Sequence, residues 1–143
     1  MPQPHPELTL LYDGSCPICL GEMEALRQRD THGRLAGIDV SALPAGASVL
    51  GVTREAAMQA MTGVHADGRV IRGVEVFRRS YALVSVTWVA TITRLPLVAP
   101  VLEGLYPVFA RHRQRLPNWL VRCLFGRALE RARRHCRGTC PRP

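Results

Sequence analysis

The chain has 143 residues, of which 47% are hydrophobic and 21% are charged, and its formal net charge is +8. This length and composition indicate one ordinary globular domain with a core of its own, and they exclude a disordered or repeat protein. All 19 basic residues are arginine, and residues 76–143 hold 13 of them against 2 acidic residues. We expect these arginines to form solvated helix faces. No recognition motif accompanies them, so we do not expect a nucleic-acid partner.

The amino terminus bears on where the protein works. Residues 1–14 contain no basic segment followed by an apolar stretch and a small-residue cleavage site, so no secretory signal is predicted. We therefore expect a cytoplasmic, reducing location. In such a location the five cysteines are thiols, metal ligands or catalytic groups and not permanent disulfides.

The first predicted elements are a strand, a turn and a helix. Residues 7–12, ELTLLY, form a short apolar run that predicts a buried strand, and Asp13 and Gly14 end it with turn chemistry. From Pro17 onward apolar residues recur at helical spacing. Proline suits the first position of a helix because no amide donor is lost there. Cys16 is therefore placed at the helix N-cap, where we expect its side chain to be partly exposed.

The next elements complete a recognisable order. Residues 35–40 predict a second strand, and residues 53–62 predict a capped helix. Residues 64–73, VHADGRVIRG, predict a hairpin, and a helical pattern follows over residues 74–84. Strand, helix, strand, helix, hairpin and helix together predict an α/β fold, a thioredoxin-like sheet with flanking helices.

The longest uncharged run is found at residues 80–93. This run is too short to span a bilayer as a helix, and it predicts a buried helix. Trp88 lies in this run and precedes an arginine-rich segment. A weak contact with a membrane surface therefore stays open as an alternative.

Residues 95–143 predict a C-terminal helical extension of two or three helices. Cys123 lies there among apolar residues and is predicted to belong to the core. We expect a thioredoxin-like core at residues 1–94 and an arginine-rich extension at 95–143 that packs on it, within a single domain. Four prolines are predicted to break the helices of the extension: Pro96, Pro100, Pro107 and Pro117.

The pair Cys16 and Cys19 carries the chemistry that the sequence predicts. A thiol attacks a disulfide only as the thiolate, and the unpaired amides of a helix amino terminus stabilise that anion. Cys16 is therefore the candidate nucleophile. Cys19, one turn further into the helix, is placed to resolve a mixed disulfide. Asp13 either accepts a proton from Cys19 during exchange or simply begins the turn.

A zinc site is the alternative interpretation of the same pair. Cys16 and Cys19 could join Cys136 and Cys140, or His135, in a site with tetrahedral ligands. The strand before the pair and the long helix after it favour redox chemistry over zinc. Two inert buried thiols are a further alternative. The role of Cys136 and Cys140 stays open.

The motif YDGSCPIC, followed by an amphipathic helix, resembles that of the DCC family of bacterial thiol-disulfide oxidoreductases. ADGRVIRGVEVFRRSYALV and LYPVFARHRQRLP are similar to later segments of that family, in the same order. The resemblance implies a thioredoxin-like fold and protein-disulfide reductase or dithiol exchange activity, with Asp13, Cys16 and Cys19 matching the family motif. It names no substrate.

One departure from thioredoxins concerns the loop that faces their cysteine pair. Those proteins carry a cis-proline there, whereas alignment on the hairpin places Thr62 or Gly63 at that position in this chain. Without the proline, substrate docking by this loop is in question, and metal binding by the pair stays open.

Three functions follow from these observations. The first is a thiol-disulfide oxidoreductase with no bound cofactor, whose partners are a disulfide-containing protein or small molecule and an unknown thiol reductant. The second is a metal-binding module that uses the cysteine pair. The third is a non-catalytic adaptor whose basic helical half binds an acidic partner or a membrane surface.

Overall fold

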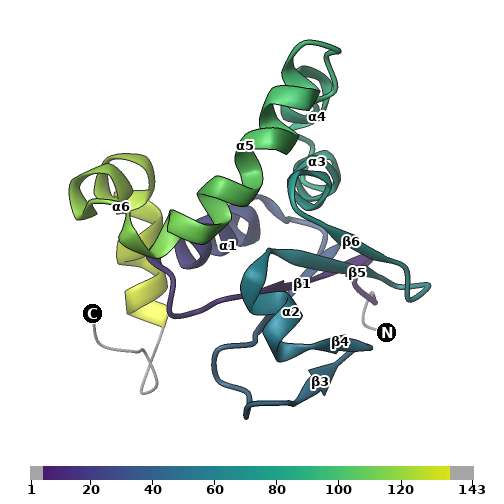
Figure 1. The fold of residues 1–143 in the computed structure, drawn as a ribbon, viewed down its shortest axis with the longest axis vertical. Helices are drawn as coiled ribbons and strands as arrows, with labels where there is room; N and C mark the ends of the chain where they lie inside the picture. The colour runs from purple at the N-terminus through teal and green to yellow at the C-terminus, as the bar shows by residue number, and fades with distance from the viewer. Residues whose placement is uncertain (1–4, 136–143) are drawn as a thin grey trace.

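The structure is a computed structural model that describes residues 5–135. A four-stranded sheet with the order β2-β1-β5-β6 forms its centre (Figure 1). Strand β1 pairs in parallel with β2 and antiparallel with β5, and β5 pairs antiparallel with β6. A separate small hairpin joins β3 to β4. The strands are β1 (Leu8–Tyr12), β2 (Leu35–Asp39), β3 (Ser48–Val49), β4 (Val52–Thr53), β5 (Thr62–His65) and β6 (Val70–Arg72).

Helices surround this sheet and continue beyond it. They are α1 (Pro17–Arg29), α2 (Arg54–Gln59), α3 (Val74–Leu83), α4 (Thr87–Thr93), α5 (Val98–His112), the single 3₁₀ turn η1 (Arg113–Arg115) and α6 (Asn118–His135). The order β1-α1-β2-α2-β5-β6-α3 is the one the sequence predicts. The chain therefore has an α/β, thioredoxin-like fold, in which β1 and α1 are joined by the turn that carries the cysteine motif.

Alternation along β1 explains why both faces of the sheet are covered. Leu8 and Leu10 point to a core shared with α1 and α3, whereas Leu11 points to a second core shared with α2 and β4. All three leucines are fully buried. Figure 1 shows α1 and α3 on one side of the sheet and α2 with β3 and β4 on the other. The strand that leads into the site is thus held on both faces.

The helices after the sheet are attached at two places. Helix α6 packs closely along α1. Arg78 of α3 is buried and ties α4 and α5 to the core, because its guanidinium donates to the Thr93 carbonyl at 2.7 Å and pairs with Glu103 at 3.1 Å. A buried arginine with several partners fixes an orientation more firmly than an exposed pair does. The sequence boundary at residue 94 falls at the end of α4.

The single buried helix predicted for residues 80–93 is wrong. Helix α3 ends before Ser85, which has a positive φ of 65°, and α4 starts afresh at Thr87. Valine, serine and threonine alternate there, and their low helix propensity favours a break. Within α4 only Ala90 is buried, and Trp88 is 63% exposed. The hydrophobicity of residues 80–93 therefore did not indicate that α4 is buried.

Three further predicted helix boundaries are also wrong. Pro100 and Pro107 lie within α5 and do not break it, whereas Pro96 and Pro117 lie between helices as predicted. Pro100 is in the first turn, where amides have no partner within the helix, so its missing donor costs nothing. Helix α2 ends at Gln59 and does not reach Thr62, which begins β5.

Within residues 5–135 no single helix is long and apolar enough to cross a bilayer. Helix α4 and residues 98–115 pass by length and composition only as a pair, which is bent by 95° at the break.

Candidate active site

The cysteine motif forms the amino-terminal end of α1. Cys16 is the N-cap residue with extended backbone angles, and Pro17 follows it at the first helical position, as predicted. The Cys16 sulfur accepts a hydrogen bond from the Cys19 amide at 3.4 Å, and the Cys19 thiol donates to it at 3.0 Å. Both donors therefore point at one sulfur atom, which is the arrangement that favours a thiolate on Cys16.

The pKa values of the two thiols are shifted in opposite directions for this reason. The pKa of Cys16 is lowered from 9.0 to about 7, chiefly by the hydrogen bond from the Cys19 thiol and also by the Cys19 amide and the charge of Arg113. Burial and the Asp13 carboxylate act in the opposite direction. The pKa of Cys19 is raised far above its ordinary range, because its proton is held against the Cys16 sulfur and because the thiol is buried. Cys16 is thus the thiol that ionises first.

Neither sulfur is open to solvent. Cys16 is 0% exposed, which corrects the expectation that a residue before the first turn would be partly exposed. Cys16, Ile18 and Cys19 form an apolar cluster with Val121 of α6, and Leu116 packs against it. The covering residues come from α6 and from the segment just before it, about a hundred positions further along the chain, so no local pattern around Cys16 indicated them.

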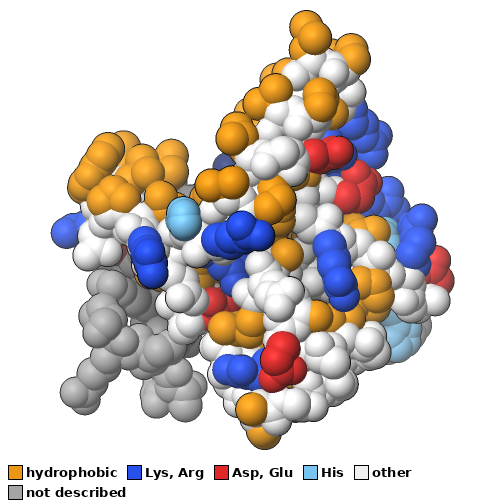
Figure 2. All heavy atoms as spheres, in the orientation of Figure 1, with side chains coloured by type: hydrophobic (Ala, Val, Ile, Leu, Met, Phe, Trp, Pro, Cys, Tyr) orange, Lys and Arg blue, Asp and Glu red, His pale blue; other side chains and the backbone are white. Residues whose placement is uncertain are grey.

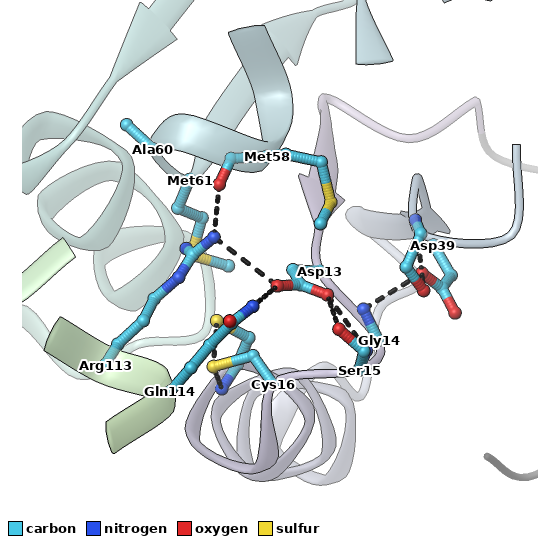
Figure 3. A network of polar contacts seen from close by, with 12 residues as sticks. Asp13, Gly14, Ser15, Cys16, Asp39, Met58, Ala60, Met61, Arg113 and Gln114 are labelled. Carbon is cyan, nitrogen blue, oxygen red and sulfur yellow. Dashed lines mark hydrogen bonds and ion pairs between the residues drawn. The ribbon is translucent and has the colours of Figure 1, made fainter. Parts of the chain in front are cut away.

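Asp13 is at the centre of a buried polar network (Figure 3). It is 0% exposed, and its Oδ1 accepts from the amide and hydroxyl of Ser15 at 3.0 and 2.5 Å. Its Oδ2 accepts from Gln114 Nε2 at 2.9 Å and is 3.6 Å from Arg113 Nη2. The predicted turn role is therefore visible in the structure, and the carboxylate also joins the motif to η1.

Gly14 is required by the geometry of the same turn. Its amide donates to Asp39 Oδ1 at 2.9 Å. A Cβ at position 14 would lie 2.0 Å from the Asp39 Oδ2 atom, which is closer than any contact allows. The end of β1 and the end of β2 are held together by this close approach.

Arg113 and Gln114 are functional candidates that the sequence reasoning missed. Arg113 is only 6% exposed, and its Nη2 donates to the Met58 carbonyl at 2.5 Å as well as facing Asp13. Its charge lowers the pKa of Cys16. It is one of 13 arginines in the second half of the sequence, and nothing local distinguishes it from the others. Only the fold brings η1 to the cysteine motif.

An open pocket lies beside this network. It has a volume of about 680 Å³ and lies between the end of α2 and the last turns of α5 with η1. Tyr106, Arg113 and Gln114 are among its lining residues, and neither cysteine is. The pocket shares Arg113 and Gln114 with the Asp13 network, so a group bound there would lie next to the residues that adjust the Cys16 thiol.

The remaining sequence candidates are placed as follows. Cys123 is exposed, so its predicted place in the core is wrong. Cys136 and Cys140, the extra ligands of the zinc alternative, lie outside the described residues. Within residues 5–135 no group of three or more His, Cys, Asp or Glu side chains is placed to hold a metal ion, and no peptide bond is cis. Thr62, one of the two residues aligned with the missing proline, is buried and donates its hydroxyl to the Ala60 carbonyl.

A family model and a relative each match most of this chain. A model of the DCC1-like thiol-disulfide oxidoreductase family matches residues 10–119, a range that includes both the cysteine motif and η1. An uncharacterized chloroplastic protein of Arabidopsis thaliana is 33% identical over 116 residues, which cover 78% of this chain and 54% of that protein. The chain thus spans about half the length of this relative. No solved structure matches the chain.

Proposed function

Because this chain belongs to the DCC1-like thiol-disulfide oxidoreductase family, we propose that it reduces protein or small-molecule disulfides through Cys16 and Cys19. The observation that carries the proposal is the 3.0 Å hydrogen bond from the Cys19 thiol to the Cys16 sulfur. This bond stabilises the thiolate on Cys16. It also keeps the second sulfur within about 1 Å of bonding distance, since a disulfide bond is about 2 Å long.

The reaction proceeds in two exchanges. In the first, the Cys16 thiolate attacks one sulfur of the substrate, which forms a mixed disulfide and releases the other substrate sulfur as a thiolate. In the second, Cys19 loses its proton and attacks the Cys16 sulfur. This step forms the Cys16–Cys19 disulfide and releases the second substrate sulfur. Two electrons have then passed to the substrate, and an external thiol reductant restores the dithiol.

Asp13 is the proposed acceptor for the Cys19 proton. The high pKa of Cys19 makes the second exchange depend on removal of that proton. Asp13 is a buried carboxylate whose charge acts on both thiols. Its other contacts, to Ser15 and Gln114, hold it in place at the end of β1.

Substitution of each cysteine tests the proposal. We expect Cys16→Ser to abolish reduction of a model disulfide, and Cys19→Ser to accumulate a mixed disulfide on Cys16 that mass spectrometry detects. The matched control is Cys123→Ser, which removes an exposed thiol on α6 and should leave the rate unchanged. Full disulfide-reducing activity in Cys16→Ser would contradict the proposal.

The proposal extends to the cofactor requirement and the location of the reaction. We expect no bound cofactor, because the dithiol itself carries the two electrons. The cytoplasmic location stays a prediction from the sequence. The name of the Arabidopsis relative places that protein in the chloroplast.

A further inference from the structure

The orientation of α5 is fixed by one of its faces. Glu103 pairs with the buried Arg78 of α3 at 3.1 Å, and the Tyr106 hydroxyl accepts from the Met61 amide at 3.1 Å. Tyr106 also packs edge-on against Phe77, with ring centroids 6.2 Å apart. The side of α5 that carries Glu103 and Tyr106 therefore faces the rest of the protein.

The opposite side of α5 is apolar and exposed. Leu97, Val101, Leu105 and Val108 are spaced by four, four and three residues, so they form one stripe along the helix. They are 84%, 56%, 58% and 53% exposed. A surface helix ordinarily turns its polar side to water, and none of the fifteen residues of α5 is buried.

The stripe continues onto the neighbouring helix. Trp88 and Ile92 of α4 are 63% and 46% exposed. We define the outer apolar face as these two residues with Leu97, Val101, Leu105 and Val108. Figure 2 shows hydrophobic side chains gathered along α4 and α5, with a second group at α6. An exposed apolar surface of this extent marks a binding surface, since single exposed apolar residues do not cluster in this way.

Charge indicates what covers this face. Arg111 and Arg115 are exposed, and Arg111 lies one turn beyond Val108. Arg94, at the other end of α5, is also exposed and is 3.9 Å from Glu75 of α3. Residues 87–135 contain only two acidic residues, and one of them, Glu103, is turned toward Arg78. A second copy of the chain would bring like charges together. A partner with negative charge above an apolar layer fits both features, and this is the chemistry of an anionic lipid surface.

We propose that the outer apolar face docks the protein on anionic membranes, with its apolar side chains entering the interface and the flanking arginines facing lipid phosphates. Docking of this kind lies in the plane of the membrane and requires no spanning helix. It is independent of the redox proposal, because neither cysteine nor any member of the Asp13 network belongs to this face.

Vesicle sedimentation of the full chain tests the proposal. We expect binding to vesicles of equal parts phosphatidylglycerol and phosphatidylcholine, and little binding to phosphatidylcholine alone. Leu105→Ser should weaken binding about tenfold, since a buried leucine contributes strongly to transfer from water. The matched control is Val70→Ser, which removes an exposed apolar residue of β6 and should have no effect.

Arginine substitutions test the charge contribution separately. Arg111→Gln should weaken binding about fivefold, because one arginine near an anionic surface contributes about that factor. Arg72→Gln, an exposed arginine on β6, is its control. Disulfide reduction in solution should be unchanged in all four variants, so failure of this proposal is separable from failure of the redox proposal.

Tryptophan fluorescence gives an independent readout. The chain contains two tryptophans, Trp88 and Trp119, and they are 63% and 70% exposed. Anionic vesicles should shift the emission of Trp88 to shorter wavelength, and Trp119→Phe should retain this shift.

Three results would overturn the docking proposal. The first is protein that stays in the supernatant with anionic vesicles. The second is vesicle binding that Leu105→Ser leaves intact, which would indicate charge attraction alone, as for an acidic protein or nucleic acid. The third is a stable dimer at low salt that Leu105→Ser dissociates, which would assign the face to a second copy.

Discussion

The buried ion pair beside the cysteine motif has a measurable consequence. Arg113 lowers the pKa of Cys16, so Arg113→Gln should raise it and move the pH profile of disulfide reduction to higher pH. A rise of about half a unit to one unit in the pKa of Cys16 would reduce the ionised fraction of this thiol near pH 7 about two- to fivefold. Arg113→Lys should restore much of the profile, because it keeps the charge.

The control for this variant is Arg111→Gln, which removes an exposed arginine two positions away. It should leave the profile in place. A loss of activity in Arg113→Gln that is equal at every pH would indicate a structural role and contradict the electrostatic one.

Asp13→Asn separates the two exchanges. The Asp13 charge raises the pKa of both cysteines, so its loss should make Cys16 more reactive at low pH. The same change removes the proposed proton acceptor for Cys19 and should slow the second exchange about tenfold or more. Rapid-quench mass spectrometry should then show the mixed disulfide accumulating. If Asp13→Asn resolves the mixed disulfide at the normal rate, the proton-acceptor role is wrong.

The two thiols also make stability depend on pH. The lowered pKa of Cys16 contributes stability that is complete above pH 9.0 and is lost as the pH falls through about 7. The raised pKa of Cys19 contributes stability below its ordinary value, which is lost as the pH rises further. Relative to the Cys16→Ser/Cys19→Ser variant, the reduced protein should gain free energy of unfolding from about pH 7 to 9 and lose it above. Urea unfolding under reducing conditions measures this difference, and a flat difference would contradict it.

Among the elements, α6 packs on the cysteine pair through Val121. We therefore expect α6 to limit the access of reagents to Cys16. Val121→Ala removes about 1–2 kcal/mol of that packing and should speed alkylation of Cys16 about five- to thirtyfold. Leu124→Ala, an exposed leucine on the same helix, is the control and should leave the rate unchanged. Equal rates in both variants would show that α6 does not limit access.

Local sequence patterns predicted the elements whose signals are local. The run before Asp13, the proline at the start of α1 and the hairpin around Asp67 and Gly68 each depend on neighbouring residues, and the structure confirms them. The burial of Cys16 and the place of Arg113 could not be predicted in this way. The burial of Cys16 depends on Leu116 and Val121, and the place of Arg113 depends on Asp13. These are contacts between distant parts of the chain.

Some helix boundaries were also predicted wrongly from local sequence patterns. Pro107 predicts a helix break, because proline has no backbone amide donor and its ring crowds the preceding turn. Helix α5 nevertheless continues through it. Tyr106 and Glu103 anchor the helix on the core at this point, and tertiary contacts outweigh the local penalty. The prediction for Trp88 was wrong for another reason. The uncharged run around Trp88 predicted burial, whereas its side chain is exposed.

At the scale of the whole molecule, positive charge is concentrated in the second half of the sequence, which also carries the outer apolar face. Residues 1–75 carry 6 arginines against 9 acidic residues, and residues 76–143 carry 13 against 2. Repulsion between the basic halves should keep the protein monomeric at low ionic strength. At salt concentrations where the screening length falls to about 3 Å, association through the outer apolar face should increase. Light scattering across a salt series checks this, and association that is strongest at low salt would contradict it.

Cys16 is the central residue of the site, because Cys19 and Arg113 lower the pKa of its thiol. The most direct test is the rate of Cys16 alkylation as a function of pH, followed by mass spectrometry of the peptide that contains Cys16. We expect the rate to have its midpoint at a pKa of about 7. A midpoint near the value of about 8.5 that an ordinary free cysteine shows would contradict it.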